Sequence, residues 1–235
     1  MSQISAVIFD AFETLFHNDP ALWQQSFRDL CQAQHLDIEP LVLWQEWKTR
    51  ERRFRKTRLN LEQPELSPPF KSYCQAWRDT FRETFQAISL KGDPDAAVGL
   101  CVEALTRREP FPEVREAIEG LRGRWRLGVL SNADDAFLYP LLRRTGLTFD
   151  VVRTSEGCRA YKPLPGPFHQ VCGLLHVQPQ EALYVGDSLL DDVHGAKRVG
   201  MRAAWVNRNG LSREEGLLPP DYEIHSLMEM ENILA

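Results

Sequence analysis

The chain has 235 residues, of which 43% are hydrophobic and 26% charged, so it can bury the core of one large domain or of one domain with a modest insertion. Binding to nucleic acid usually requires a basic face, and the net charge of -5 gives no overall sign of one, so a nucleic-acid partner is not expected. The apolar runs are strand-sized and follow no basic leader, so we expect a soluble, cytoplasmic protein without a membrane partner. Five scattered cysteines without a C-x-x-C pair argue against a disulfide scaffold or a zinc cage.

A continuous apolar run over residues 6–9 is the first strand signal, and it ends at Asp10. Such a run without polar alternation is typical of a central parallel strand that is covered on both faces. We therefore expect a buried strand here, with an acidic side chain at the point where it stops.

A helical period replaces the strand pattern from about Asp19 to Arg107. The prolines of residues 61–69 separate the second and third of about four expected helices. Aromatic stripes mark this block, and packing between helices is favoured over the lining of a ligand pocket. The two stripes are Trp23, Phe27, Leu30 and Cys31, and then Tyr73, Trp77, Phe81 and Phe85.

One predicted helix of this block carries a run of basic residues. Their side chains would point around most of the helix circumference rather than along one stripe. A solvated helix face is the favoured interpretation, and contact with an anionic substrate or a polyanion is the alternative. The run consists of Lys48, Arg50, Arg52, Arg53, Arg55, Lys56 and Arg58.

Strands alternate with helices in the rest of the chain, which implies right-handed βαβ crossovers and a parallel sheet. We expect an α/β core made of residues 1–17 and 108–235, and a helical domain of residues 18–107. The expected strands of the second part are 127–130, 151–154, 182–185 and 202–206, and the expected helices are 113–122, 134–144, 167–175 and 191–199.

Polar residues follow the predicted strands: Asp10, Ser131 with Asn132, Lys162 in a loop, and Asp187. Ligands of open parallel sheets bind beyond the carboxyl ends of the strands. Each residue alone has a structural explanation, as a turn cap, a helix N-cap or a surface charge. Their occurrence together and in this order favours a common site.

Four motifs contain these residues. They are Phe9-Asp10-Ala11-Phe12-Glu13-Thr14-Leu15, Leu130-Ser131-Asn132, Tyr161-Lys162-Pro163, and the stretch from Val185-Gly186-Asp187-Ser188 to Asp192, which is the most specific. The set resembles the four motifs of the haloacid dehalogenase superfamily. The resemblance implies a hydrolase with a doubly wound, Rossmann-like parallel sheet of order 3-2-1-4-5, and it makes the helical insertion the family's cap domain. That order would place Asp10 and Asp187 on neighbouring strands.

The resemblance implies that Asp10 is the nucleophile and forms an aspartyl-phosphate. A carboxylate beside a dianionic phosphate is repelled unless a cation lies between them, and Mg²⁺ supplies that cation. Because Mg²⁺ prefers oxygen ligands, Asp10, the backbone carbonyl of Phe12 and Asp187 are its expected protein ligands. Asp192 is expected either to bind a metal-bound water or to orient Lys162.

Substrate binding and transition-state stabilisation fall to three residues by the same resemblance. Ser131 and the backbone N–H of Asn132 would bond to oxygens of the transferring group, and Lys162 would neutralise the charge that develops there. Asp191 competes with Asp192, but the motif spacing favours Asp192 and places Asp191 outward on its helix. The expected substrate is a small phosphorylated molecule, and the oligomeric state is open.

Position 12 departs from the phosphatase pattern. Phosphatases of this superfamily carry a second aspartate two residues after the nucleophile, as acid for the leaving alcohol and base for the water, where this chain has Phe12. A placed acid/base contributes ~10²–10⁴-fold, so a phosphomonoesterase without one is expected to be slow. Glu13 is not expected to replace it, because neighbouring residues of an extended segment point to opposite faces.

The 2-haloacid dehalogenases offer the main alternative. They carry an aromatic residue like Phe12 and displace halide from carbon without an acid, but that branch has lost the metal aspartate that Asp187 retains. A haloacid site also requires an arginine for the substrate carboxylate, for which Arg28 and Arg50 are available.

Two further alternatives stay open. Phosphonate-cleaving relatives use a cap lysine to form an imine, and Lys48 or Lys56 would be candidates, although solvated charges are the favoured interpretation. A catalytically weak protein that binds a phosphorylated ligand is the other. The order of preference is a Mg²⁺-dependent phosphohydrolase, then a haloacid dehalogenase, then a binding protein.

Overall fold

The computed structural model describes residues 3–234, which divide into two compact units. The α/β unit contains residues 3–17, 109–132 and 142–234. The helical unit contains Asn18–Arg108 and also Ala133–Leu141, a segment that follows the second strand. Over residues 3–234, no helix has both the length and the apolar character needed to cross a membrane.

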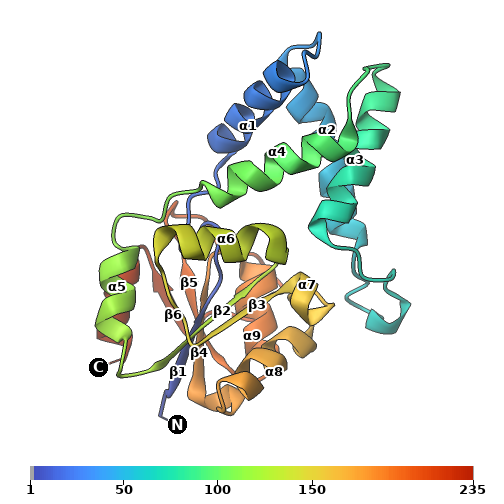
Figure 1. The fold of residues 1–235 in the computed structure, drawn as a ribbon. Coiled ribbons are helices and arrows are strands. Elements are labelled where there is room, and N and C mark those ends of the chain that lie inside the picture. Colours follow the sequence, from blue (N-terminus) through green and yellow to red (C-terminus); the bar gives the residue numbers. More distant parts are fainter. Residues whose placement is uncertain (1–2, 235) are drawn as a thin grey trace. The chain divides into compact units, whose positions relative to one another are not determined.

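A six-stranded, fully parallel sheet forms the centre of the α/β unit, in the order β3-β2-β1-β4-β5-β6 (Figure 1). The predicted order 3-2-1-4-5 is confirmed. The sequence pattern missed β6, because a three-residue edge strand with an exposed middle residue has no periodic signal. The strands are β1 (Ala6–Phe9), β2 (Arg126–Ser131), β3 (Val151–Thr154), β4 (Ala182–Gly186), β5 (Arg202–Val206) and β6 (Tyr222–Ile224).

Short helices connect these strands. The helix expected over residues 191–199 is instead a π-helical turn, η3, followed by the four-residue helix α9. The elements are α5 (Val114–Leu121), α6 (Asp135–Thr145), α7 (Ser155–Cys158), α8 (Pro165–Leu174), η2 (Pro179–Glu181), η3 (Leu189–His194), α9 (Gly195–Arg198), η4 (Leu227–Glu229) and α10 (Met230–Leu234).

Strand β1 is buried on both faces, as its unbroken apolar run predicts. Ala6 and Ile8 belong to a core cluster with Phe168 of α8 and Ala196 of α9. Side chains alternate along a strand, so Val7 points to the opposite face, where it is also fully buried. The strand that carries Asp10 at its end is thus fixed from both sides.

Aromatic packing holds the helical unit together. The two predicted stripes contact each other: the rings of Phe27 and Phe81 are stacked at 5.7 Å, and those of Trp23 and Trp77 meet edge to face at 5.7 Å. Core packing, the favoured interpretation, is what the structure shows for Phe27, Trp77 and Phe81, which are buried, whereas Trp23 is half-buried. The helices are α1 (Pro20–Ala33), α2 (Pro40–Thr57), α3 (Tyr73–Ala87) and α4 (Pro94–Thr106), with a short turn η1 (Pro64–Leu66) before α3.

Asp134 caps the first turn of α3. Its two carboxylate oxygens accept hydrogen bonds from the backbone N–H groups of Tyr73 at 2.8 Å and Cys74 at 2.7 Å. The side chain is fully buried, and Ser72 adds a capping box with Gln75. The open N–H groups at the start of α3 therefore have a charged acceptor.

The close approach of α9 to α8 predicts the effect of a single methyl group. A Cβ added at Gly195 would lie 2.7 Å from Cζ of Phe168 and 3.0 Å from the backbone Cα of Pro163. We expect Gly195→Ala to lower the free energy of unfolding by ~1–3 kcal/mol, measured by urea denaturation. Gly173 of α8 has open space around it, so Gly173→Ala should be neutral or stabilising by up to ~1 kcal/mol. Equal midpoints for Gly195→Ala and wild type would contradict the packing argument.

Candidate active site

Pairing of neighbouring parallel strands brings Asp10 and Asp187 to the same edge of the sheet. In the β1–β4 ladder Phe9 lies opposite Val185, and the N–H of Asp10 donates to the Val185 carbonyl at 2.9 Å. Asp187 follows the last residue of β4 directly. Each acid thus follows the carboxyl end of its strand, and ligands of open parallel sheets bind at that edge.

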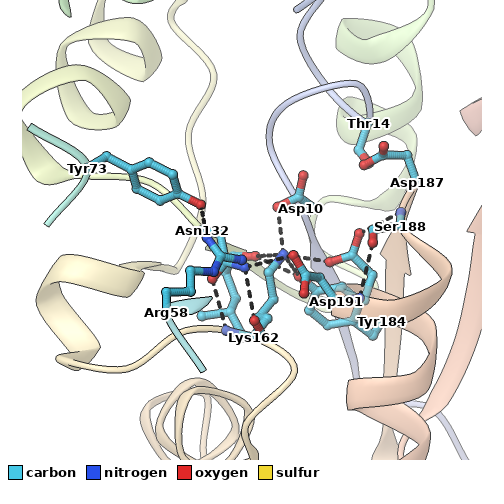
Figure 2. A network of polar contacts seen from close by, with 12 residues as sticks. Asp10, Thr14, Arg58, Tyr73, Asn132, Lys162, Tyr184, Asp187, Ser188 and Asp191 are labelled. Atoms are coloured by element: carbon cyan, nitrogen blue, oxygen red, sulfur yellow. Dashed lines mark hydrogen bonds and ion pairs between the residues drawn. The ribbon is translucent and has the colours of Figure 1, made fainter. Parts of the chain in front are cut away.

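Lys162 is the buried cation of this edge. Its ammonium group donates to Oδ1 of Asp10 at 2.7 Å and to the hydroxyl of Tyr184 at 2.7 Å (Figure 2). It also donates to Oδ1 of Asp192 at 2.6 Å. The carbonyl of Leu130 lies 3.0 Å from Nζ and also accepts from the Tyr184 hydroxyl at 2.6 Å. An ammonium has only three protons for these four acceptors. Because the Tyr184 hydroxyl donates its own proton to the Leu130 carbonyl, the lysine protons remain available for Asp10, Asp192 and the Tyr184 oxygen.

Asn132 holds the backbone on both sides of Lys162. Its side-chain oxygen accepts from the Lys162 N–H at 2.9 Å, and its amide nitrogen donates to the Lys162 carbonyl at 3.1 Å. The same nitrogen donates to Oδ2 of Asp191 at 3.1 Å. The expectation that Asp191 points outward is wrong: Asp191 is half-buried, because the segment is a π turn with a wider residue spacing than the assumed α-helix.

Three carboxylates gather around this single lysine. Oxygens of Asp10, Asp187 and Asp192 all lie within 4.8 Å of one another. Asp192 also accepts from the N–H of Ser188 at 2.9 Å, whereas Asp187 has a long contact of 3.4 Å with the Thr14 hydroxyl. The cluster therefore holds more negative charge than Lys162 neutralises.

The pKa values of the network follow from burial and from this charge imbalance. Burial raises the pKa of Asp192 to about 7 against the opposing effect of Lys162. Burial and the charges of Asp192 and Asp10 raise the pKa of Asp187 well above its ordinary range. Burial by itself would lower the pKa of Lys162, but the neighbouring Asp10 and Asp192 raise it well above its ordinary value, so the lysine stays charged.

The loop after Asp10 is a turn, not an extended segment as expected. Glu13 has a left-handed backbone with φ of 64°, and Phe12 forms an isolated bridge with Phe16. The alternation argument that directed Glu13 away from position 12 therefore does not apply. The Glu13 carboxylate adds to the charges that raise the pKa of Asp187, so it acts on the acidic cluster electrostatically.

The structure thus joins Asp10, Asn132, Lys162 and Asp192 in one hydrogen-bonded network, with Asp187 at its edge. Ser131 is buried at the end of β2, and its hydroxyl has no hydrogen-bond partner within residues 3–234. The side chain of Phe12 is half-buried in the turn.

Sequence reasoning missed Tyr184, Thr14 and Trp205. Trp205 donates from Nε1 to the backbone carbonyl of Asp187 at 2.8 Å and so holds the loop that follows β4. A phenol in the middle of the apolar strand β4 was the one available signal, because a buried tyrosine hydroxyl needs a partner.

The raised carboxyl pKa values predict how the metal-free protein responds to pH. A carboxyl with a higher pKa in the folded state holds its proton more tightly when folded, so unfolding free energy falls as pH rises from the unfolded value of about 4 through the folded value. For Asp192 this window reaches about 7. We expect wild type with a chelator to lose stability between about pH 5 and about pH 8, and Asp187→Asn to lose less.

Urea unfolding at the two pH values measures this difference, with Asp37→Asn as the control because Asp37 is exposed and outside the network. Equal losses in wild type and in Asp187→Asn would show that Asp187 does not share the charge of the cluster.

Known proteins with this architecture point to one family. A model of haloacid dehalogenase-like hydrolases matches residues 4–200. The chain is 27% identical over 242 residues to haloacetate dehalogenase H-2 of Moraxella sp. (strain B), with all of both chains covered. It is 32% identical over 173 residues to phosphoserine phosphatase of Thermus thermophilus, which covers 70% of this chain and 69% of the relative. The solved L-2-haloacid dehalogenase RSc1362 shares the fold, with a TM-score of 0.79, 23% identity and 99% of both chains covered. The chain belongs to the haloacid dehalogenase-like hydrolase family.

Proposed function

We propose that this hydrolase is a Mg²⁺-dependent phosphohydrolase that cleaves a small phosphorylated metabolite through an aspartyl-phosphate on Asp10. The observation that carries the proposal is the cluster of three carboxylates, Asp10, Asp187 and Asp192, opposed by the single ammonium of Lys162. A site with this excess of carboxylate oxygen is suited to a hard divalent cation.

The residues present fit a magnesium ion. Asp10, Asp187 and the backbone carbonyl of Phe12 would hold it, since all three offer oxygen. Asp192 is already bound by Lys162 at 2.6 Å and by the Ser188 N–H at 2.9 Å, which supports a role in orienting the lysine. When bound, Mg²⁺ would neutralise the repulsion between the Asp10 carboxylate and the phosphoryl group.

Catalysis begins at the second oxygen of Asp10. Lys162 holds Oδ1, while Oδ2 has no hydrogen-bond partner within the described chain and is available to attack. Attack forms the Oδ2–P bond and breaks the bond from phosphorus to the leaving oxygen. Water then attacks phosphorus, inorganic phosphate departs, and the Asp10 carboxylate is regenerated.

Three residues act on the transferring group. The Ser131 hydroxyl and the Asn132 N–H would donate to its oxygens, and the Lys162 ammonium would stabilise the charge of the transition state. Asn132 has a second function in this scheme, because its side chain fixes the lysine backbone from both sides.

Phe12 limits proton transfer in this mechanism. With no carboxyl on that side chain, the leaving oxygen must take its proton from solvent, and the attacking water must lose one to solvent or to product. We expect a preference for aryl or acyl phosphates, whose leaving groups depart without protonation, over alkyl phosphates such as sugar phosphates.

A haloacid dehalogenase is the second candidate, and Phe12 together with the full-length match to a haloacetate dehalogenase favours it. In that reaction Asp10 would attack carbon, expel halide and form an ester that water cleaves. The two arginines available for the substrate carboxylate bond within their own helices: Arg28 to Gln25, and Arg50 to Glu46. Asp187, which this reaction does not use, supports the phosphohydrolase instead.

A substrate panel separates the two functions. Aryl, acyl and alkyl phosphates and 2-haloacids are offered to the protein with Mg²⁺ and with a chelator, and phosphate and halide release are recorded together, with Asp10→Asn as the inactive control. We expect phosphate release that requires Mg²⁺ and is fastest with aryl or acyl phosphates. Halide release that persists in chelator, without phosphate release, would assign the protein to the dehalogenases.

Restoring the acid at position 12 is the sharpest mutational test. We expect Phe12→Asp to raise turnover of alkyl phosphates, by up to ~10²–10⁴-fold, because it adds a proton donor where Asp10 and Lys162 already stand. Phe12→Asn is the matched control, since it removes the ring without adding an acid. Both variants are first checked for folding and for Mg²⁺ binding by calorimetry. A folded, Mg²⁺-binding Phe12→Asp protein no faster than Phe12→Asn would contradict the proposed mechanism.

A further inference from the structure

The helical unit contains a pocket of its own, about 270 Å³ in volume, between residues of α1 and α2. Three tryptophans form its apolar walls: Trp23, Trp44 and Trp47. The pocket is open to solvent, since Pro20, Arg52 and Arg55 of its lining are exposed. None of its lining residues belongs to the network around Lys162.

Some basic residues of α2 line this pocket, and others form ion pairs elsewhere. Lys48, Arg52 and Arg55 line the pocket, because their spacing of four and three residues places them on one side of the helix. The others include Arg50, which bonds to Glu46, and Arg53, which pairs with Glu83. Arg52 and Arg55 are exposed, as the interpretation of a solvated face predicts, whereas Lys48 is half-buried.

The positive charge at the pocket is only partly matched. Glu51, the one carboxylate in the lining, is buried and pairs with Arg55. Arg52 has no ion pair or hydrogen bond within residues 3–234, and the ammonium of Lys48 lies 4.1 Å from the centre of the Trp44 ring. Burial and the charge of Arg52 lower the pKa of Lys48, against the opposing effect of Glu51.

The aromatic walls leave one polar donor unused. The rings of Trp23 and Trp47 are stacked at 5.5 Å. Trp47 is 3% exposed, and its indole N–H has no acceptor in the part of the chain that the structure describes. A buried indole N–H usually has a partner, and the Trp47 side chain that carries this one belongs to the pocket lining.

We propose that this pocket binds a small aromatic anion, with one or two rings among the tryptophans and a carboxylate or similar group against Lys48 and Arg52. Flat rings pack well against indoles, and the anion supplies the charge that Glu51 does not. The pocket is small for a drug-sized ligand but adequate for a mono- or bicyclic acid. This binding site is additional to the proposed phosphohydrolase activity and does not rest on it.

Benzoate and 2-naphthoate are suitable probes, since they contain neither phosphate nor halogen and are substrates of neither candidate reaction. Calorimetry on the full chain measures affinity, and tryptophan fluorescence reports on the pocket because it contains three of the six tryptophans. We expect both acids to bind and to quench this fluorescence, and benzyl alcohol, which lacks the charge, to bind at least tenfold more weakly.

Variants locate the binding. Lys48→Gln and Arg52→Gln should each weaken the binding of benzoate at least tenfold. Lys56 is an exposed cation of the same helix outside the pocket, so Lys56→Gln should change the affinity for benzoate less than twofold. Ser131→Ala reports on the catalytic edge and should also leave it unchanged. No binding of either acid, equal affinity in Arg52→Gln and wild type, or a loss confined to Ser131→Ala would overturn the proposal. Phosphate and halide release are measured separately, so failure of the catalytic assignment is distinguishable from failure of this one.

Discussion

The buried ammonium of Lys162 is the charge on which the polar edge of the sheet depends. Moving an ion out of water costs several kcal/mol, so this lysine is tolerated only because Asp10 and Asp192 hold it at 2.7 and 2.6 Å. Removing one partner of such a pair costs about 3–5 kcal/mol, because the other charge stays buried. In the proposed mechanism Asp10 therefore has two roles: it is the nucleophile, and its charge stabilises the buried Lys162. The ion pair with Lys162 fixes the position of Asp10 before a substrate binds.

Parallel topology explains how a small number of residues achieves this arrangement. Strands β1, β2 and β4 all end at one edge, so residues more than 100 positions apart in the chain lie together without long loops. The cost is electrostatic, since Asp187 and Asp192 are brought close to Asp10 with one cation among them. Sites that place like charges together commonly serve function rather than stability, and the raised carboxyl pKa values fit that pattern.

The sequence predicted the strand order and the edge at which the polar residues meet, because both follow from hydrophobic period and parallel topology. It did not predict the contacts within that edge. Nothing marks Tyr184 apart from a phenol in an apolar strand, and its partner Lys162 is reached only through the fold. The motif spacing placed Asp191 outward on a helix, whereas the segment is a π turn and Asp191 accepts a hydrogen bond from Asn132. The turn at Glu13 was not predicted, because a left-handed residue leaves no periodic trace.

Asp134 caps helix α3, and this contact shows whether the helical insertion can be transferred as a separate unit. Asp134 comes two residues after Asn132, yet its carboxylate serves the N–H groups of Tyr73 and Cys74, some sixty positions earlier in the chain. A gene segment that encodes residues 18–108 alone would keep the Ser72 capping box but leave the N–H groups of Tyr73 and Cys74 without this acceptor. The insertion is therefore not a self-contained cassette. Exchanging it between relatives requires Asp134, two residues after the Ser131-Asn132 motif, to be exchanged as well, which ties the evolution of the insert to a motif of the catalytic edge.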